Sequence, residues 1–422
     1  MNGLAARAGV IVVVLGLCGA LTIAALVNVA AGIVTDERVT ANKDLLAATI
    51  AYVPNSAPLN ARLAEAEMGE DDRDISSIES HAKRAVNISP WDYRQRLLLA
   101  TVKEAEGDRA AAEQSLREAL ALAPNYTEVH WRLANLLLRE GKLAKSVSEF
   151  KTATTSNASL LPGTLDLLER VSGNNLKALQ AVTPGDPRSQ VLLAHFLLTH
   201  SRIPDAITIF GGIDRTSLID LPESPPFIDS LVSQGHFEEA RGLWVGLVSG
   251  AYAQPGHPLT LIWNGSFESD ISKSLAQFDW RITRNEYAVT SIDSSIARSG
   301  SRSLRIDFTG RDTTTLDGQV KQIVVVKPGS HYRLECYART ENLDTPEGPR
   351  VVVTDLASSE IVSSDPIPAG TSDWRAIAID FTAPVSARVV VIAIKRVPKF
   401  SYDNPTRGAV WFDDFVLDER AK

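Results

Sequence analysis

The 422-residue sequence has little of several residue types, and each shortage excludes a class of protein. Only two cysteines occur, Cys18 and Cys336, so no framework of intrachain disulfides is available. Lysine and arginine number 43 against 51 acidic residues, a formal net charge of −8. A nucleic-acid partner is therefore not predicted, because phosphate contacts need clustered basic residues. Aromatic residues make up 6% of the chain, so most of them are expected in the core.

What remains is the composition of an ordinary globular protein, with 44% hydrophobic and 22% charged residues. That balance excludes a largely disordered chain, a collagen-like fibre and a transporter with many membrane spans. A domain has about 150 residues, so this length predicts two or more folded units.

Catalytic signatures are also missing. The sequence contains no HExxH, GxSxG, GxGxxG or GxxxxGKS/T pattern. His195 and His200 are five residues apart, whereas two metal ligands on one helical face need a spacing of three or four. Cys336 has no nearby histidine, which favours an inert thiol. The adjacent Asp413 and Asp414 are expected to point to opposite faces of a strand and so cannot form a catalytic pair. We predict that the chain is not an enzyme.

Residues 9–34 form the one long apolar run, 26 residues without a charge and with only Thr22 and Asn28 as polar interruptions. At about 1.5 Å per residue, a helix of this length crosses about 30 Å of hydrocarbon. We expect residues 1–8 to be a short tail and residues 9–34 a single-pass anchor. A cleavable signal peptide is the alternative, although its apolar region is normally about 7–15 residues. We expect the anchor to lie in the cytoplasmic membrane. A tail this short more often stays in the cytoplasm, which predicts that the bulk of the chain lies on the extracytoplasmic, periplasmic side.

From Pro90 onward the sequence superposes on itself at a shift of 34 residues. The matched pairs are Pro90 with Pro124, Ala100 with Ala134, Gly107 with Gly141, Leu116 with Phe150 and Ala119 with Ala153. The same period returns later, pairing Leu197 with Leu231, Ala206 with Ala240 and Phe210 with Trp244. A degenerate unit precedes Pro90, and an irregular pair of helices is expected at about 164–182. Such a period indicates an α-solenoid, because each unit buries its apolar face only against its neighbours.

The residues carrying this period resemble the tetratricopeptide repeat. The resemblance implies helical hairpins over residues 40–253, with Gly107 and Gly141 ending first helices in a left-handed turn. It also implies a concave face that docks a protein partner. A spacer that only positions other domains is the alternative.

Beyond residue 256 helical periodicity gives way to short β-branched runs separated by Gly, Pro, Asp and Ser, such as SLRIDF, YRLECYART and WRAIAIDF. Their alternation indicates half-buried antiparallel strands. We therefore predict an antiparallel jelly-roll β-sandwich over residues 258–420. The complete fold class is multidomain, α then β: a transmembrane helix, a solenoid and a sandwich.

Four motifs in this region, in order, resemble the carbohydrate-binding modules that accompany xylanases. They are NGSFE from Asn264, SGSRSL from Ser299, PG at Pro328 with Tyr332 following, and WFDDF from Trp411. The resemblance implies a structural calcium ion held by Glu268, Asp413 and Asp414; the alternative is that these carboxylates cap strand ends or face solvent. It also implies a glycan ligand contacted by aromatic side chains. The candidate aromatic residues are Trp280, Tyr287, Tyr337, Trp374 and Tyr402. Of these, Trp280, Tyr287 and Tyr402 are the predicted contacts, and Trp280 and Tyr402 lie beside polar loop sequence. Trp374 and Trp411 lie in strand-like runs and are expected to be structural.

Together these features predict a non-catalytic, membrane-anchored envelope scaffold. The solenoid would dock a protein and the sandwich a glycan, in the assembly, export or retention of a surface polysaccharide. Two alternatives remain open: a sandwich that is purely structural or binds protein, and an unrecognised envelope glycosidase, which would need two carboxyl groups about 5–9.5 Å apart.

Overall fold

The computed structural model describes residues 2–35, 43–252, 260–311, 315–357, 359–398 and 405–420. The chain divides into two compact units, Met1–Gly185 and Asp186–Lys422. The division lies inside the helical region, so the last helices belong to the same unit as the β-sandwich. Each unit is described by itself.

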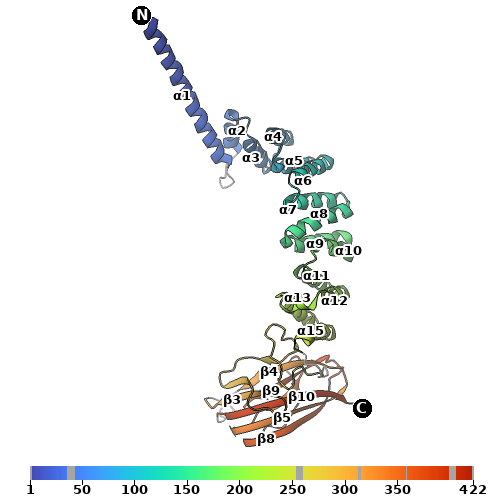
Figure 1. Ribbon diagram of the computed structural model, residues 1–422. Coiled ribbons are helices and arrows are strands. Elements are labelled where there is room, and N and C mark those ends of the chain that lie inside the picture. Colours follow the sequence, from blue (N-terminus) through green and yellow to red (C-terminus); the bar gives the residue numbers. More distant parts are fainter. Residues whose placement is uncertain are drawn as a thin grey trace. The chain divides into compact units, whose positions relative to one another are not determined.

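The first unit is entirely helical (Figure 1). Its elements are α1 (Asn2–Thr35), α2 (Lys43–Tyr52), α3 (Ala57–Met68), α4 (Ile75–Ile88), α5 (Tyr93–Glu106), α6 (Arg109–Leu122), α7 (Thr127–Arg139), α8 (Leu143–Ser156), η1 (Ala158–Leu160), α9 (Leu161–Ser172) and α10 (Leu176–Val182). From α3 onward they form helical hairpins. The irregular pair expected at about 164–182 is present as α9 and α10, with η1 before them.

The repeat residues build the hairpins as the sequence predicts. Gly107 and Gly141 follow α5 and α7 with φ of 84° and 74°, a left-handed conformation that a side chain rarely adopts. The small Ala100 and Ala112 are buried between α5 and α6, where Leu116 fills the groove beside them. The small residues let the helix axes approach closely, and the larger one excludes water.

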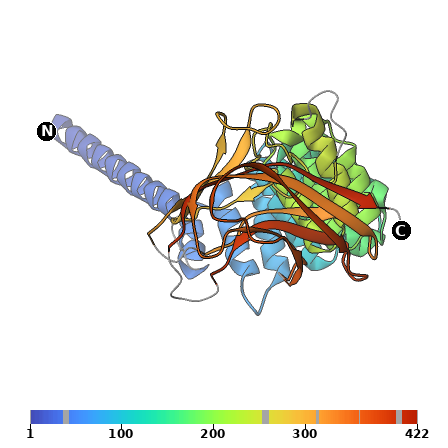
Figure 2. The ribbon, with the colours of Figure 1, turned by 90° about the horizontal axis from the view of Figure 1, so that it is seen from below.

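Helix α1 contains the segment Leu17–Thr35, whose mean hydropathy of 2.2 and length allow it to cross a membrane. A signal sequence would pass the same test. Both views show only its C-terminal end against α2 and α3 (Figures 1 and 2). There Ala31 and Val34 are buried together with Leu46, Leu59 and Leu63. The end of α1 is thus part of the core of the first helices.

The second unit begins with helices and ends with strands. The helices are α11 (Pro187–Thr199), α12 (Ile203–Gly211), α13 (Arg215–Ile219), α14 (Ser224–Ser233) and α15 (Phe237–Tyr252). Ala206, Phe210, Ala240 and Trp244, which the 34-residue period pairs, are all buried. The helical repeats therefore continue up to the sandwich.

The strands are β1 (Arg281–Ile282), β2 (Ala288–Asp293), β3 (Ser303–Thr309), β4 (Leu316–Val325), β5 (His331–Asp344), β6 (Arg350–Thr354), β7 (Glu360–Ser363), β8 (Gly370–Thr382), β9 (Val389–Arg396) and β10 (Arg407–Arg420). In the described residues they form two five-stranded antiparallel sheets, ordered β1-β4-β9-β6-β7 and β2-β3-β10-β5-β8. The predicted antiparallel β-sandwich is confirmed (Figure 1).

Alternation along the strands fills the space between the sheets. On β5, Tyr332, Leu334, Cys336 and Ala338 are buried in the core, while the residues between them are half-buried. Burial raises the pKa of the Cys336 thiol well above its ordinary value, as expected for an inert cysteine. The opposite face of this sheet carries the polar residues discussed below.

Helix α15 is joined to the sandwich by more than the chain. The Trp244 side chain is fully buried, and its Nε1 donates a hydrogen bond to the carbonyl oxygen of Leu275 at 2.9 Å. Its ring lies edge-on to those of Trp263 and Phe278, with centroid distances of 5.1 and 5.7 Å. Arg241 of the same helix donates to the carbonyl of Thr260 at 2.9 Å. The last repeat and the opening loops of the sandwich thus share one core.

Candidate functional site

The candidate site is the outer face of the sheet β2-β3-β10-β5-β8. On β3, Leu304, Ile306 and Phe308 are in the core, so Arg305 and Asp307 point away from it. The same alternation places a row of polar and aromatic residues on this face. They are Asp293 on β2, Arg305 and Asp307 on β3, Trp411 on β10, Arg333, Glu335, Tyr337 and Arg339 on β5, and Asp380 on β8.

Trp411 stands at the centre of this outer face. Across the strands it is opposite Arg305 on one side and Arg339 on the other. The Cζ atoms of these arginines lie 4.9 and 5.8 Å from the centroid of its ring, within the range of a cation–π interaction. Trp411 is only 1% exposed. It is structural, as predicted, but it supports a layer of guanidinium groups and not the core between the sheets.

Asp293 fixes one side of this arrangement. Its Oδ2 accepts hydrogen bonds from Trp411 Nε1 at 2.8 Å and from Arg305 Nη1 at 3.4 Å. Burial opposes ionisation of Asp293, yet the hydrogen bonds from Ser295 and Trp411 outweigh it and hold its pKa well below the ordinary value. Arg305 also pairs with Asp307 at 2.7 Å. Trp411 and Arg305 are therefore held in place by charged hydrogen bonds.

Tyr337 is covered in the same way. The Cζ of Arg298 lies 3.3 Å from the centroid of its ring, and that guanidinium also pairs with Asp414. Farther along β5, Arg333 bridges Glu335 and Asp380 at 2.5 and 2.9 Å. The face offers many hydrogen-bond donors and acceptors in fixed positions, which suits hydroxyl-rich ligands.

Of the three predicted glycan contacts, Trp280 is wrong. Its side chain is fully buried, packs between Phe267 and Phe415, and donates a hydrogen bond from Nε1 to the carbonyl of Asn264 at 3.1 Å. The neighbouring loop sequence is polar, but the ring turns inward. Tyr287 is half-buried beside β2 and stays a prediction. Tyr402 lies outside the described residues.

The sequence-based prediction of the site named only aromatic residues and missed the arginines of the outer face. A signal was present: in YRLECYART, Arg333, Glu335, Tyr337 and Arg339 alternate with apolar residues. That pattern predicts one polar face, but not which side chains cover the rings on it.

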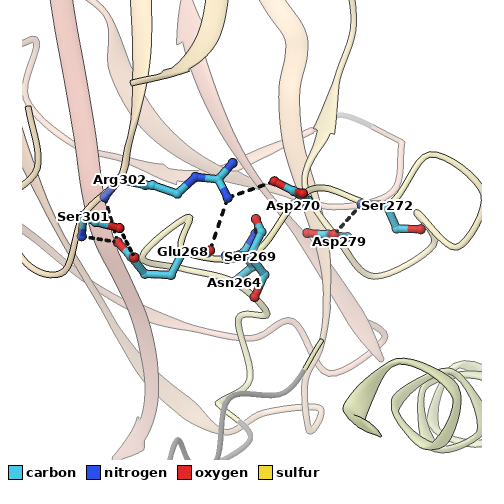
Figure 3. A network of polar contacts seen from close by, with 8 residues as sticks. All are labelled: Asn264, Glu268, Ser269, Asp270, Ser272, Asp279, Ser301 and Arg302. Carbon is cyan, nitrogen blue, oxygen red and sulfur yellow. Dashed lines mark hydrogen bonds and ion pairs between the residues drawn. The ribbon is translucent and has the colours of Figure 1, made fainter. Parts of the chain in front are cut away.

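Glu268 clamps the loop before β3 (Figure 3). Its Oε1 accepts hydrogen bonds from the backbone nitrogens of Ser301 and Arg302, both at 2.8 Å, and Arg302 pairs with Asp270 at 2.9 Å. Partial burial opposes ionisation of Glu268, but these hydrogen bonds outweigh it and lower its pKa. The opening segment of the sandwich is thereby tied to the loop before β3.

Asp413 and Asp414 hold the same loop from the last strand. Asp413 is fully buried, and its Oδ2 accepts from the backbone nitrogens of Arg298 and Ser299 at 2.8 and 3.3 Å. Asp414 accepts from the Ser299 hydroxyl at 2.6 Å. The expectation that the two carboxylates point to opposite faces is wrong, because the strand has an irregularity between Asp413 and Val416 and Asp414 has a φ of 53°.

As arranged, Glu268, Asp413 and Asp414 do not fit a calcium ion. Each accepts hydrogen bonds from protein donors, and the Arg298 guanidinium occupies Asp414. Within the part of the chain that the structure describes, no group of three or more His, Cys, Asp or Glu side chains is placed to hold a metal. Hydrogen bonds and an ion pair instead tie Glu268 from the opening segment and Asp413 and Asp414 from β10 to the same loop before β3.

The position after Asn264 requires glycine. A Cβ on Gly265 would lie 2.1 Å from the carbonyl oxygen of Phe415, and the carbonyl of Gly265 accepts a hydrogen bond from the Phe415 nitrogen at 2.9 Å. The backbones of the opening loop and of β10 therefore touch directly, and a side chain would separate them.

The buried carboxyl group of Asp279 leads us to predict a pH dependence of the free energy of unfolding. Its carboxylate accepts hydrogen bonds from the backbone nitrogen of Ser272 (Figure 3) and from that of Trp280, and burial raises its pKa to about 6. A raised folded-state pKa gives stability at low pH that is lost as pH rises through about 6, by at most about 3 kcal/mol for a two-unit shift. We expect Asp279→Asn to flatten the change in unfolding free energy between about pH 4 and 7, measured by urea titration.

The control for this experiment is Asp380→Asn, which removes an exposed carboxylate. It should leave the dependence between about pH 4 and 7 as in the parent chain. Equal slopes for the parent and for Asp279→Asn would contradict the assignment.

Two family profiles match parts of this chain. Residues 259–399 match the carbohydrate binding domain, and residues 103–159 match the tetratricopeptide repeat. No curated protein matches the chain. The chain thus combines tetratricopeptide repeats with a β-sandwich of the carbohydrate-binding-module type.

Solved structures with similar parts include both kinds. A structure titled "CBM4 structure and function" is 16% identical and covers 38% of this chain and 99% of its own, with a TM-score of 0.28. The MamA protein is 12% identical, covering 37% and 84%, with a TM-score of 0.31. A thermophilic tetratricopeptide-repeat protein of Thermus thermophilus is 26% identical, covering 33% and 71%, with a TM-score of 0.27.

Proposed function

We propose that this protein is a non-catalytic, membrane-anchored scaffold that binds a glycan through the outer face of the sheet β2-β3-β10-β5-β8 and a protein partner through its helical repeats. Its proposed place is the cytoplasmic membrane, with the chain after α1 on the periplasmic side, and its proposed process is the assembly, export or retention of a surface polysaccharide. The observation that carries the glycan part is the match of residues 259–399 to the carbohydrate binding domain, together with the ordered polar face.

The chemistry of that face supports a sugar ligand. Arg333, Glu335 and Asp380 form a fixed network of donors and acceptors on strands β5 and β8. Sugar hydroxyls both donate and accept, so they fit such a network without new charges. The strands beneath are locked by the core, which keeps the positions of these groups fixed in the absence of ligand.

The burial of Ala31 and Val34 supports a retained anchor. These residues pack with Leu46, Leu59 and Leu63, so cleavage of α1 would remove two side chains from a core. Burial of apolar side chains contributes about 25 cal/mol per Å². A retained helix is therefore favoured over a signal peptide.

A structural sandwich is the second candidate function, and one observation favours it. The rings of Trp411 and Tyr337 are covered by arginines, and Trp280 is buried, so none of these three presents a bare ring for stacking on a pyranose. A sandwich of this kind that binds no sugar would only hold the last repeat through Trp244.

Affinity electrophoresis of the full chain in detergent through gels containing polysaccharides tests the proposal. We expect at least one polysaccharide to retard the protein. Tyr337→Ala should weaken that binding about tenfold, corresponding to about 1.4 kcal/mol, because removing the ring releases Arg298. Tyr52→Ala, which removes a 77% exposed tyrosine from α2, outside the sandwich, is the matched control and should bind like the parent chain.

No retardation by any polysaccharide, from a chain shown by circular dichroism to be folded, would favour the structural sandwich. Loss of binding in Tyr287→Ala alone would move the site to the margin near β2. Gels with calcium and with EDTA should agree, and a calcium requirement would show that Asp414 leaves Arg298 for a metal. Release of reducing ends from the bound polysaccharide would overturn the proposal of a non-enzyme and favour a glycosidase.

A further inference from the structure

Arg339 differs from the other arginines of the outer face. Arg298 pairs with Asp414, Arg305 with Asp307, and Arg333 with Glu335. Among the residues that the structure describes, none forms a hydrogen bond or ion pair with the Arg339 guanidinium, and its Nε is buried without a partner. The group that the described residues offer to the charge of Arg339 is the Trp411 ring, whose centroid lies 5.8 Å from its Cζ atom.

An arginine in this state has unused binding capacity. A guanidinium has five N–H donors in a planar fork, and a buried donor left without an acceptor costs free energy. The Nε of Arg305, on the other side of Trp411, is also buried without a hydrogen-bond partner. The two groups flank one ring, which prevents them from folding down onto the sheet. The Nε atoms are covered and cannot meet a ligand directly, so an acceptor on a ligand would pair with the Nη donors of the half-buried Arg339.

The charge of Arg339, unpaired among the described residues, selects an anion, because the other arginines named on this face are already paired with carboxylates. Arg298, over Tyr337, and Arg339 are neighbours along this face because Tyr337 and Arg339 are two residues apart on β5. Glu341, the next residue on that side of β5, is exposed. Its carboxylate repels an anion that approaches Arg339 from the side away from Tyr337. An anionic group therefore approaches Arg339 from the side of Tyr337, where it meets two guanidinium groups.

We infer that Arg339, supported by Trp411 and flanked by Arg298, recognises an anionic sugar, with a carboxylate or sulfate group carried by the polysaccharide. This inference rests on the proposed glycan-binding function and adds the ligand class. Trp411 is too deeply covered to stack on a sugar ring, so binding depends on charged hydrogen bonds. An arginine fork pairs with two oxygens of one carboxylate or sulfate, which gives direction as well as charge.

The test compares three polymers with the full chain in detergent: polygalacturonate for carboxylate, dextran sulfate for sulfate, and dextran as the neutral member. We expect one of the two anionic polymers to bind at least about tenfold more tightly than dextran at low salt, and the advantage to shrink in about 0.5 M NaCl through screening. The preferred polymer identifies whether carboxylate or sulfate is the natural group.

Arg339→Gln should reduce that preference about tenfold. Arg339→Lys keeps the charge but not the fork, so it should lose about threefold and retain the salt dependence. Arg388→Gln is the control, because it removes an exposed arginine from the turn before β9, outside this face. Its affinity should equal that of the parent chain.

Two results would overturn the inference while leaving the proposed function intact. One is binding to dextran or another neutral polysaccharide that equals or exceeds binding to both anionic polymers. The other is an anionic preference that Arg339→Gln and Arg388→Gln lower equally, which would mean attraction by overall charge. Failure to bind any polysaccharide, neutral or anionic, would instead overturn the proposed function itself.

Discussion

Replacing Trp280 with alanine is expected to lower the free energy of unfolding of the sandwich by about 3–5 kcal/mol, the usual cost of removing a large aromatic side chain from a core. Trp280 packs against Phe267 and Phe415, with ring centroids 5.2 and 4.9 Å away, and contacts both the opening loop and β10. The substitution leaves a cavity and also the carbonyl of Asn264 without its donor. Because a domain has only about 5–15 kcal/mol of stability, this loss would be a large fraction of it.

Urea denaturation followed by circular dichroism measures this effect. Trp91→Ala is the matched control, because that tryptophan is 84% exposed and its removal should change the unfolding free energy by less than about 0.5 kcal/mol. Trp280→Phe refills most of the space and should cost less than the alanine variant. Two results together would restore the prediction that Trp280 contacts sugar: a Trp280→Ala chain that is as stable as the Trp91→Ala control, and weaker glycan binding by that same Trp280→Ala chain.

Replacing Trp244 with alanine is expected to cost a similar amount, about 3–5 kcal/mol, and to uncouple α15 from the sandwich. Its ring packs against Trp263 and Phe278, and its Nε1 satisfies the carbonyl of Leu275. Without it, both ring contacts and the hydrogen bond to Leu275 are lost. The two parts should then unfold in separate transitions, a departure from two-state behaviour.

Limited proteolysis and urea unfolding test this prediction together. Cleavage between α15 and β1 should become faster in Trp244→Ala, and helical and tryptophan signals should no longer change at the same urea concentration. Trp244→Phe keeps most of the packing and loses one hydrogen bond, at about 1 kcal/mol. A single, unshifted transition in Trp244→Ala would show that the helices and the sandwich fold independently of this contact.

The sequence predicted the parts of the fold that depend on local pattern. The 34-residue period placed Ala100, Leu116 and Gly107 correctly, because a repeat buries the same positions in each unit. The alternation in YRLECYART placed Tyr332, Leu334 and Cys336 in the core, because strand side chains point to opposite sides in turn. The resemblance to carbohydrate-binding modules predicted the correct kind of sandwich.

Predictions about single side chains in the site were less successful. Trp280 follows polar residues in the chain, yet it is buried, because its surroundings are set by Phe267 and Phe415. Regular alternation would place Asp413 and Asp414 on opposite faces, but an irregularity in β10 brings both to one loop. A chain pattern contains no information about such a local departure.

The sequence by itself thus determined the membrane-compatible helix, the helical repeats, the strands and which face of each strand is polar, since each follows from the spacing of apolar residues along the chain. Only the tertiary structure decided that Arg305 and Arg339 flank Trp411, that Trp244 joins α15 to the sandwich, and that Arg298 holds Asp414. These contacts join residues far apart in the chain, and strand order and register, which no local pattern specifies, bring them together.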